Sequence, residues 1–175
     1  DSPNLFLSLK LIKFPESKIK ELLSWIKSEE DKQFWSGNTF QEGLTAEVFL
    51  FHLQRKDLIS FAFVGDDGSL NCYGEIVNPG DNKGVLCRVI VNPEIRRKGI
   101  GKSFVQEILH WSFNQKKMTL ITLNTFGHNK PARKCYQSLG FIEIALKENY
   151  RKIGDCWRDL IVMEKRNRYN GNKIL

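Results

Sequence analysis

The stretch Val89–Gly101 reads VIVNPEIRRKGIG, and the rest of the chain is best understood outward from it. Its first residues end an apolar strand that we predict over 84–91. The chain then passes through Asn92-Pro93 into a basic loop that carries two glycines. Beyond the loop, apolar residues recur every three or four positions, which predicts an amphipathic helix to about Gln115.

The loop has the composition of an anion site. Gly99 and Gly101 allow the backbone to approach a ligand without a Cβ in the way. The first amides of the following helix have no intrahelical partner, and the positive end of the helix dipole lies behind them. Arg96, Arg97 and Lys98 add full positive charges. Together these features favour a bound phosphate or pyrophosphate.

Two other phosphate-binding loops do not fit. Gly101-Lys102-Ser103 matches the end of the P-loop pattern GxxxxGK[ST], but Arg96 stands where its first glycine belongs. The GxGxxG pattern needs a third glycine. The loop does fit [QR]xxGx[GA], and it therefore resembles the coenzyme A pyrophosphate loop of the GCN5-related N-acetyltransferases, the GNAT superfamily. An ordinary basic turn with two glycines remains the alternative for this motif taken alone.

A second motif lies at residues 128–141, which read HNKPARKCYQSLGF. A helix is predicted from Lys130 to Leu139, with Asn129 as its N-cap and Gly140 just beyond its end. On its own, Tyr136 in the apolar stripe of this helix is typical of a core residue. The spacing, however, resembles the second signature of the same superfamily, NxxAxxxYxxxGF, through Asn129, Ala132, Tyr136, Gly140 and Phe141.

The resemblance covers about 58–165 well and the first 57 residues only in outline. The sequence is most similar to a bacterial branch that contains ribosomal-protein-alanine and spermidine acetyltransferases. It implies an α/β (α+β) fold of the GNAT type, with a mixed central sheet of about seven strands and about four helices. We expect a single domain over 1–175, a coenzyme-A-binding core at about 84–141, and splayed central strands at 84–91 and 118–125.

The remaining elements are predicted from periodicity and turn residues. A helix is expected from Pro15 until just before Ser28, and another from Ala46 to about Lys56 with Thr45 as its N-cap. Phe34–Asn38 is expected to form a turn. A basic loop with Gly154 is expected between the last two strands. The other strands are predicted at 5–12, 58–64, 70–77, 141–146 and 155–163.

The resemblance also implies roles for individual residues. The backbone around Arg96 to Lys102 would bind the pyrophosphate, and the strand 88–91 would run beside the pantetheine arm. An amide near Ile90 would polarise the thioester carbonyl, Asn129 would bond the pantetheine, and Tyr136 would protonate the leaving sulfur. The full set of implied cofactor contacts is Val89, Ile90, Val91, Arg96, Arg97, Lys98, Gly99, Ile100, Gly101, Lys102, Ser103, Asn124, Asn129, Ala132 and Tyr136.

The general base is not fixed by the sequence. Glu75 is the leading candidate because we expect it at a strand edge of the cleft, and Glu143, His128 or a water chain are the alternatives. Cys135 is expected to be buried beside Tyr136. It is not expected to act as a nucleophile, since no histidine is obviously paired with it.

The acceptor site is also open. Aromatic residues of the first quarter could line an acceptor pocket or belong to the core: Phe34, Trp35, Phe40, Phe49 and Phe51. Glu42 and Glu47 could attract a cationic acceptor.

The net charge of +7 suggests a polyanionic partner, either coenzyme A or a nucleic acid. Nucleic acid is not expected, because the basic residues are mostly scattered and no helix-turn-helix or RNP-like pattern occurs. Four cysteines without CxxC spacing and only three histidines argue against a metal site and for free thiols in the cytoplasm. No apolar run is long enough to span a membrane.

We therefore expect an acetyl-CoA-dependent N-acetyltransferase that acts on a primary amine. The acceptor could be a protein N-terminus, a polyamine, an aminoglycoside or another small amine. A homodimer is expected from the resemblance. The alternative is a non-catalytic acyl-CoA-binding domain of the same fold.

Overall fold

The structure is a computed structural model that describes residues 9–96 and 99–168. Seven strands form one sheet in the order β1-β2-β3-β4-β5-β7-β6. Only β4 and β5 are parallel; the other neighbouring pairs are antiparallel. The predicted mixed sheet is thus confirmed. The strands are β1 Leu11–Lys13, β2 Leu58–Val64, β3 Leu70–Gly80, β4 Lys83–Val91, β5 Leu120–Phe126, β6 Ile142–Ile153 and β7 Cys156–Arg166.

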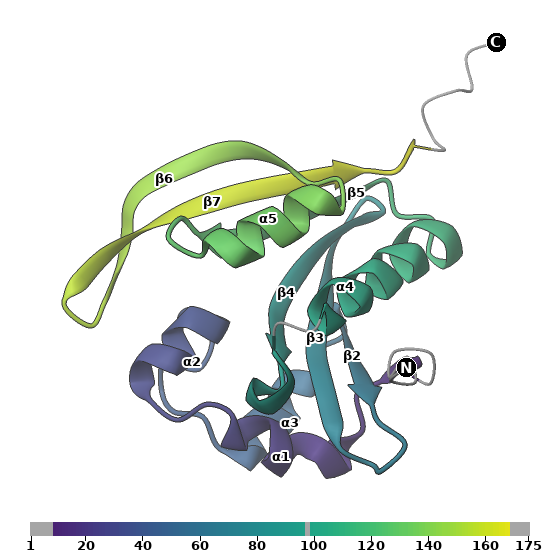
Figure 1. Cartoon of the computed structure of the whole chain (residues 1–175), viewed down its shortest axis with the longest axis vertical. Coiled ribbons are helices and arrows are strands. Elements are labelled where there is room, and N and C mark those ends of the chain that lie inside the picture. Colours follow the sequence, from purple (N-terminus) through teal and green to yellow (C-terminus); the bar gives the residue numbers. More distant parts are fainter. Residues whose placement is uncertain (1–8, 97–98, 169–175) are drawn as a thin grey trace, which may run out of the picture.

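Five α-helices flank the sheet, where about four were expected. In Figure 1, α1, α2 and α3 gather at one end of the molecule, α4 lies along β2–β4, and α5 lies along β6 and β7. A π-helical turn, Trp111–Gln115, extends α4. No helix in the described part of the chain is both long and apolar enough to cross a bilayer. The α-helices are α1 Ile19–Ser24, α2 Glu29–Ser36, α3 Ala46–Leu53, α4 Ile100–His110 and α5 Lys130–Ser138.

Two buried apolar clusters hold these layers together. The larger lies between the sheet and α4, where Phe104 and Ile108 meet Ile121 and Met163, all fully buried. The smaller joins the N-terminal helices to the sheet around Phe49. Burying one such side chain stabilises the fold by about 1.5–3 kcal/mol, so the two clusters fix the helices firmly on the sheet.

The central strands separate half-way along their length. β4 pairs with β5 only from Lys83 to Leu86. Directly after this, Arg88 and Val89 both lie opposite the single residue Gly74 of β3, because Cys87 pairs with Glu75 and Ile90 with Tyr73. Such a β-bulge bends its strand and increases the local twist. Arg88 has a φ of 51°, in the left-handed region. The bulge therefore turns β4 away from β5, as the resemblance implied.

The first quarter of the chain differs from the expected one. Residues 5–8 of the predicted first strand lie outside the described residues, and β1 starts only at Leu11. The predicted turn at Phe34–Asn38 is wrong, since its first three residues belong to α2. The polar residues 28–32 form the N-cap and the first turn of this helix. Ser28 caps the helix by accepting the Asp31 N–H, and three acidic residues lie at the positive end of the helix dipole.

The predicted basic loop between the last two strands is also wrong. β6 continues to Ile153, and β7 begins at Cys156 after the two-residue turn Gly154-Asp155. A register shift between Lys147 and Arg151 interrupts the ladder. The first half of β6 was predicted as a strand at 141–146. Its second half is polar and belongs to an edge strand, so the sequence pattern did not reveal it.

Candidate active site

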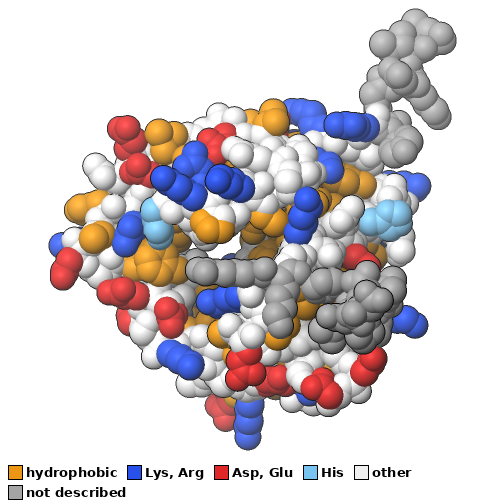
Figure 2. Space-filling model, viewed as in Figure 1, with side chains coloured by type: hydrophobic (Ala, Val, Ile, Leu, Met, Phe, Trp, Pro, Cys, Tyr) orange, Lys and Arg blue, Asp and Glu red, His pale blue; other side chains and the backbone are white. Residues whose placement is uncertain are grey.

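A cavity of about 1270 Å³ opens where β4 and β5 separate. Its walls come from α2, β4, β5, the N-terminal part of α4 and the length of α5, with further residues from β6 and β7. Figure 2 shows the surface hollowed near the centre of this face, with hydrophobic and basic side chains around the hollow. The cavity therefore lies at the splay of the sheet.

One wall carries the first sequence motif. Five of the predicted cofactor contacts reach the cavity from β4 and the loop that follows, and three more from the first turn of α4; they are Val89, Ile90, Val91, Arg96, Gly99, Ile100, Gly101 and Lys102. Ser103 does not line this cavity. Its backbone N–H donates to the Gly99 carbonyl, and the residue lines a separate small pocket. Arg97 and Lys98 lie outside the described residues.

The two glycines of the loop serve different purposes. Gly99 is the N-cap of α4 with a φ of 75°, a conformation that other residues adopt only with strain. Gly101 is needed for space, since a Cβ there would come within 3.0 Å of Val91 Cγ2. The Arg96 Nε–H donates to the Val91 carbonyl at 3.2 Å, which ties the loop back to β4.

The opposite wall carries the second motif. Asn124 reaches the cavity from β5, and Asn129, Ala132 and Tyr136 reach it from α5. Asn129 caps α5 as predicted, because its side-chain oxygen accepts the Ala132 N–H at 3.3 Å. Two motifs that are distant in sequence thus form two walls of one cavity.

Tyr136 is half-buried and packs edge-to-face on Phe141 with ring centroids 5.8 Å apart. Burial raises the pKa of its phenol far above the ordinary value, so the group stays protonated at neutral pH. Burial likewise raises the pKa of the neighbouring Cys135 thiol, which keeps that residue in its unreactive form. A protonated phenol in the wall of the cavity can donate a proton to a leaving group.

The expectation that Glu75 lies at an edge of the cleft is wrong. Its side chain is fully buried beneath α3 and does not line the cavity. One carboxylate oxygen accepts from Arg88 Nε, and the other accepts from the Tyr73 hydroxyl and lies 2.8 Å from His52 Nε2. The sequence did not indicate that His52 of α3 would cover this side chain. With every oxygen bonded, Glu75 holds Arg88 in place and has no access to a bound amine.

Arg88 links this buried network to the cavity that it lines. Its guanidinium also donates to the Thr39 hydroxyl at 3.0 Å, and its carbonyl accepts the Trp35 indole N–H at 2.8 Å. The bulge in β4 is therefore fixed from both sides, by Glu75 of β3 and by Trp35 of α2. No sequence pattern indicated Arg88, because its role depends on the bulge.

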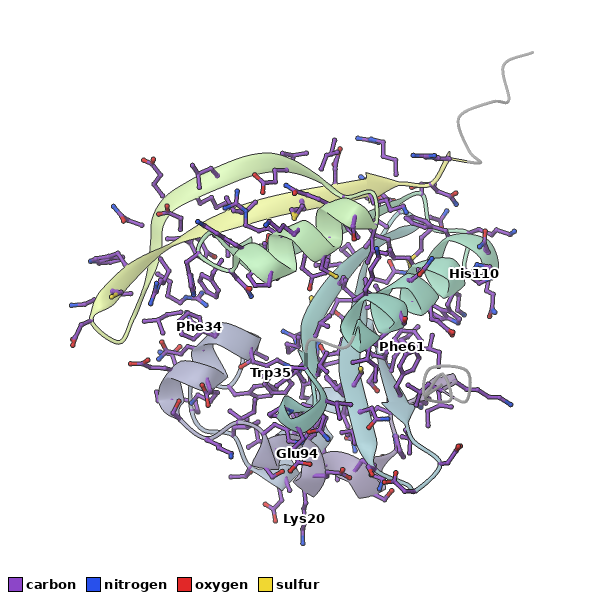
Figure 3. All side chains as sticks on the ribbon, in the orientation of Figure 1. Lys20, Phe34, Trp35, Phe61, Glu94 and His110 are labelled. Atoms are coloured by element: carbon purple, nitrogen blue, oxygen red, sulfur yellow. The ribbon has the colours of Figure 1, made fainter. Side chains whose placement is uncertain are left out.

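The aromatic residues of the first quarter divide into three groups. Phe34 and Trp35 of α2 line the cavity, and Figure 3 shows them on the side of α2 that faces the rest of the molecule. Phe40 and Phe49 are core residues, whereas Phe51 is 78% exposed. Two of the five therefore line the cavity, and a role in acceptor binding stays a prediction for them.

The acidic candidates lie elsewhere. Glu42 and Glu47 are exposed and do not line the cavity, so they give no support to a cationic acceptor. Glu143 is bonded to Arg133 at 2.8 Å and also stays outside. Among the alternative bases only His128 lines the cavity, and burial together with the nearby Arg158 lowers its pKa.

Metal-binding chemistry finds no support in the described residues, which contain no group of three or more histidine, cysteine or acidic side chains that could hold an ion. All four cysteines are free thiols: Cys72, Cys87, Cys135 and Cys156.

A family model described as "Acetyltransferase (GNAT) family" matches residues 19–141, which is more than half of the chain. The chain belongs to this family. The GNAT match spans both motifs and both walls of the cavity, so the resemblance drawn from the two motifs is confirmed. It begins within the N-terminal helices, where the sequence fitted only in outline.

Curated relatives of one of the expected kinds are found. The [ribosomal protein bS18]-alanine N-acetyltransferase of Escherichia coli strain K12 is 26% identical over 82 residues, which cover 47% of this chain and 55% of the relative. The Salmonella typhimurium protein of the same name is 24% identical over 82 residues, with the same coverage. The match thus spans about half the length of these curated relatives.

Solved structures confirm the GNAT fold over nearly the whole chain. Spermidine N-acetyltransferase from Vibrio cholerae, in complex with CoA and spermine, has a TM-score of 0.79 at 16% identity, over 92% of this chain and 96% of that one. A chimera of the Vibrio cholerae enzyme with a human counterpart gives 0.76 at 18% identity, over 91% and 95%. At these identities the likeness establishes the fold.

Proposed function

We propose that this chain is an acetyl-CoA-dependent N-acetyltransferase that acts on a primary amine. The observation that carries the proposal is the convergence of the two motifs: the glycine loop at the start of α4 and the Tyr136 face of α5 line one cavity at the splay. Family membership supports the same reading.

The cavity residues fit acetyl-CoA in charge and shape. The loop from Arg96 to Lys102 would hold the pyrophosphate, with open space at Gly99 and free amides in the first turn of α4. The segment Val89–Val91, which has left β5, would bind the pantetheine arm through its backbone. Asn129 would contact the same arm through its amide nitrogen, since its oxygen is already used as the cap of α5.

The reaction follows from three groups. The acceptor amine attacks the acetyl carbonyl directly, and no residue of the chain is acylated. A backbone N–H after the bulge, near Ile90, stabilises the negative charge that grows on the carbonyl oxygen. Tyr136 donates its proton to the sulfur as the C–S bond breaks. The proton of the amine passes to water or to His128, which is largely neutral at pH 7 because its pKa is lowered.

A thermal-unfolding comparison tests cofactor binding. Acetyl-CoA at 100 times its Kd adds about 2.7 kcal/mol of stability, or roughly 5–10 °C in Tm for a chain of this size. We expect Gly99→Glu to abolish this shift, because it adds a negative charge to the proposed pyrophosphate loop. Gly68→Glu is the matched control: Gly68 also has a left-handed φ (83°) and open space at its Cβ position, but it lies in the β2–β3 turn.

The control separates binding from folding strain. Both variants place a glutamate at a left-handed glycine, so both are expected to lower the Tm of the free protein. Only Gly99→Glu should lose the response to acetyl-CoA. A folded parent protein that shows no shift would contradict the proposal.

Three further expectations belong to the proposal. We place the protein in the cytoplasm as a metal-free enzyme, and we expect it to form a homodimer.

A non-catalytic acyl-CoA-binding domain is the second candidate; it predicts the thermal shift without acetyl transfer to any amine. Nucleic-acid binding, suggested by the charge alone, would be steeply salt-dependent.

A further inference from the structure

Two arginines face each other across the β6–β7 ladder, and one of them, Arg151, lines the cavity. Arg151 of β6 and Arg158 of β7 are directly opposite partners in the antiparallel ladder. Their side chains therefore project from the same face of the sheet, with Cβ atoms about 4.5–5.5 Å apart. Like charges in such a pair destabilise a sheet. A pair of this kind needs either neutralising neighbours or a ligand.

In the described part of the chain, neither arginine forms an ion pair with a carboxylate; the ion pairs there include Arg88–Glu75, Arg133–Glu143 and Lys32–Glu29. The Arg151 guanidinium lies at the C-terminal end of α2, where a Cβ on Gly37 would come within 2.6 Å of its Nη1. The Arg158 Nε–H is buried with no hydrogen-bond partner, and its guanidinium lies 5.6 Å from the Phe34 ring centroid. The Arg151 guanidinium lies 5.3 Å from the ring centroid of Tyr150.

The surroundings of the pair place it at the proposed acceptor site. Arg151 and His128 line the cavity, and Arg158 lies behind them against Phe34. The rings of Phe34 and Phe126 pack on His128, with centroids 5.3 and 6.2 Å away. These rings lower the exposure of the cluster to water, so its positive potential is screened less than on an open surface.

Other charges at this end do not reverse the sign. Asp31 lines the cavity and contributes a negative charge there, with one of its oxygens accepting the Lys27 backbone N–H at 3.2 Å. Lys27 lines the cavity as well. Arg88 is balanced by the buried Glu75. Among the described residues that line the cavity, Asp31 is the only acidic one, so the basic side chains there outnumber the acidic ones.

We propose that the acceptor amine also carries an anionic group, a carboxylate or a phosphate, and that Arg151 binds this group with Arg158 supporting it from behind. The inference rests on the proposed acetyltransferase function. A guanidinium presents parallel N–H donors that match both kinds of oxyanion, and the interaction is stronger in a partly dehydrated site. Conversely, a polyamine would meet a repulsive field here.

Matched amines test the inference. The initial rate of thiol release from acetyl-CoA is measured with amino acids and their carboxamides, from glycine to 4-aminobutyrate. O-phosphoethanolamine is compared with ethanolamine, and spermidine serves as the polycation. We expect at least a tenfold higher kcat/KM for the anionic member of the best pair and the lowest value for spermidine. Equal values within every pair, or a preference for spermidine, would overturn the inference.

Variants locate the effect. Arg151→Gln should raise the KM for the anionic amine tenfold or more, leave kcat within a few-fold, and leave the neutral partner nearly unchanged. Arg158→Gln should act in the same direction more weakly. The matched control is Lys152→Gln, which removes the same charge from the adjacent exposed position of β6, outside the cavity. An unchanged preference in Arg151→Gln would contradict the assignment.

A binding measurement separates this inference from the proposed function. With CoA present, N-acetyl-β-alanine should raise the Tm of the parent protein more than N-acetyl-β-alaninamide, and Arg151→Gln should remove the difference. A protein that responds to CoA but shows no preference for the acid keeps the cofactor assignment and loses the anionic subsite. A protein that does not respond to CoA loses the proposed function itself.

Discussion

At the scale of single residues, Tyr136 is the most direct test of catalysis. Its hydroxyl is the proposed proton donor, and its raised pKa keeps the proton in place over the physiological range. We expect Tyr136→Phe to lower kcat about 100-fold or more, within the usual range for loss of a general acid. The thermal shift with acetyl-CoA should persist, since the phenylalanine ring fills the same space. Unchanged turnover would remove Tyr136 from the mechanism and leave water as the donor.

The four thiols should differ widely in reactivity, because the thiolate is the reactive form. Burial raises the pKa of Cys72 to about 12, and its side chain is inaccessible. Cys156 is exposed in the β6–β7 hairpin. At pH 8 we expect a thiol reagent to label Cys156 first and Cys72 only after unfolding. Mass spectrometry of the digested protein reads out the order, and early labelling of Cys72 would contradict the burial described above.

At the scale of elements, the bulge in β4 depends on the residue opposite to it. A Cβ at Gly74 would lie 2.9 Å from Phe104 Cε2 and 3.4 Å from Val89 Cγ2. Gly74→Ala should therefore push α4 and the bulge apart, with a loss of about 1–3 kcal/mol typical of overpacking. Urea unfolding measures the loss. A variant as stable as the parent would mean that Phe104 moves freely, which its complete burial argues against.

The elements also show what the sequence can and cannot predict. Strong local signals were sufficient for α3, where Thr45 caps the helix by accepting the Val48 N–H, and for α5 with its Asn129 cap. The two motifs located both walls of the cavity. The bulge at Arg88 and the burial of Glu75 depend on contacts with α2 and α3, which lie more than 20 positions away in the chain. No local pattern encodes such contacts.

Local patterns also misled where an element is polar. α2 begins with charged residues that stabilise its first turn, and β6 is an edge strand whose exposed face carries lysines and a glutamate. The start of α2 and the second half of β6, residues 147–153, were not predicted as regular elements, because hydrophobic periodicity is the main signal of an element and neither segment buries a continuous stripe. These two elements place Phe34 and Arg151 at the acceptor end, so the least predictable part of the fold surrounds the least predictable part of the site.

At the scale of the whole molecule, the free edge of the sheet is unusually apolar. Ile142, Ile144 and Leu146 of β6 are 61%, 49% and 55% exposed. An open edge strand with exposed apolar side chains favours pairing with another chain. We expect association that increases with concentration and weakens in Ile144→Lys. Sedimentation velocity measures it; a parent protein that stays monomeric at high concentration would contradict the expected homodimer.

The half of β4 that has left β5 has a consequence for hydrogen exchange of its backbone amides. Along an ordinary central strand, neighbours on both sides hold the amide hydrogens against exchange with solvent. Between Cys87 and Val91 alternate amides point toward β5 but have lost it as a partner. In the free protein these hydrogens should exchange within seconds, while those bonded to β3 exchange slowly. A ligand that lies along this edge and accepts their bonds would act as a temporary eighth strand. Because β4 lacks β5 as a neighbour there, ligand binding along this edge could be measured residue by residue from the amide exchange rates.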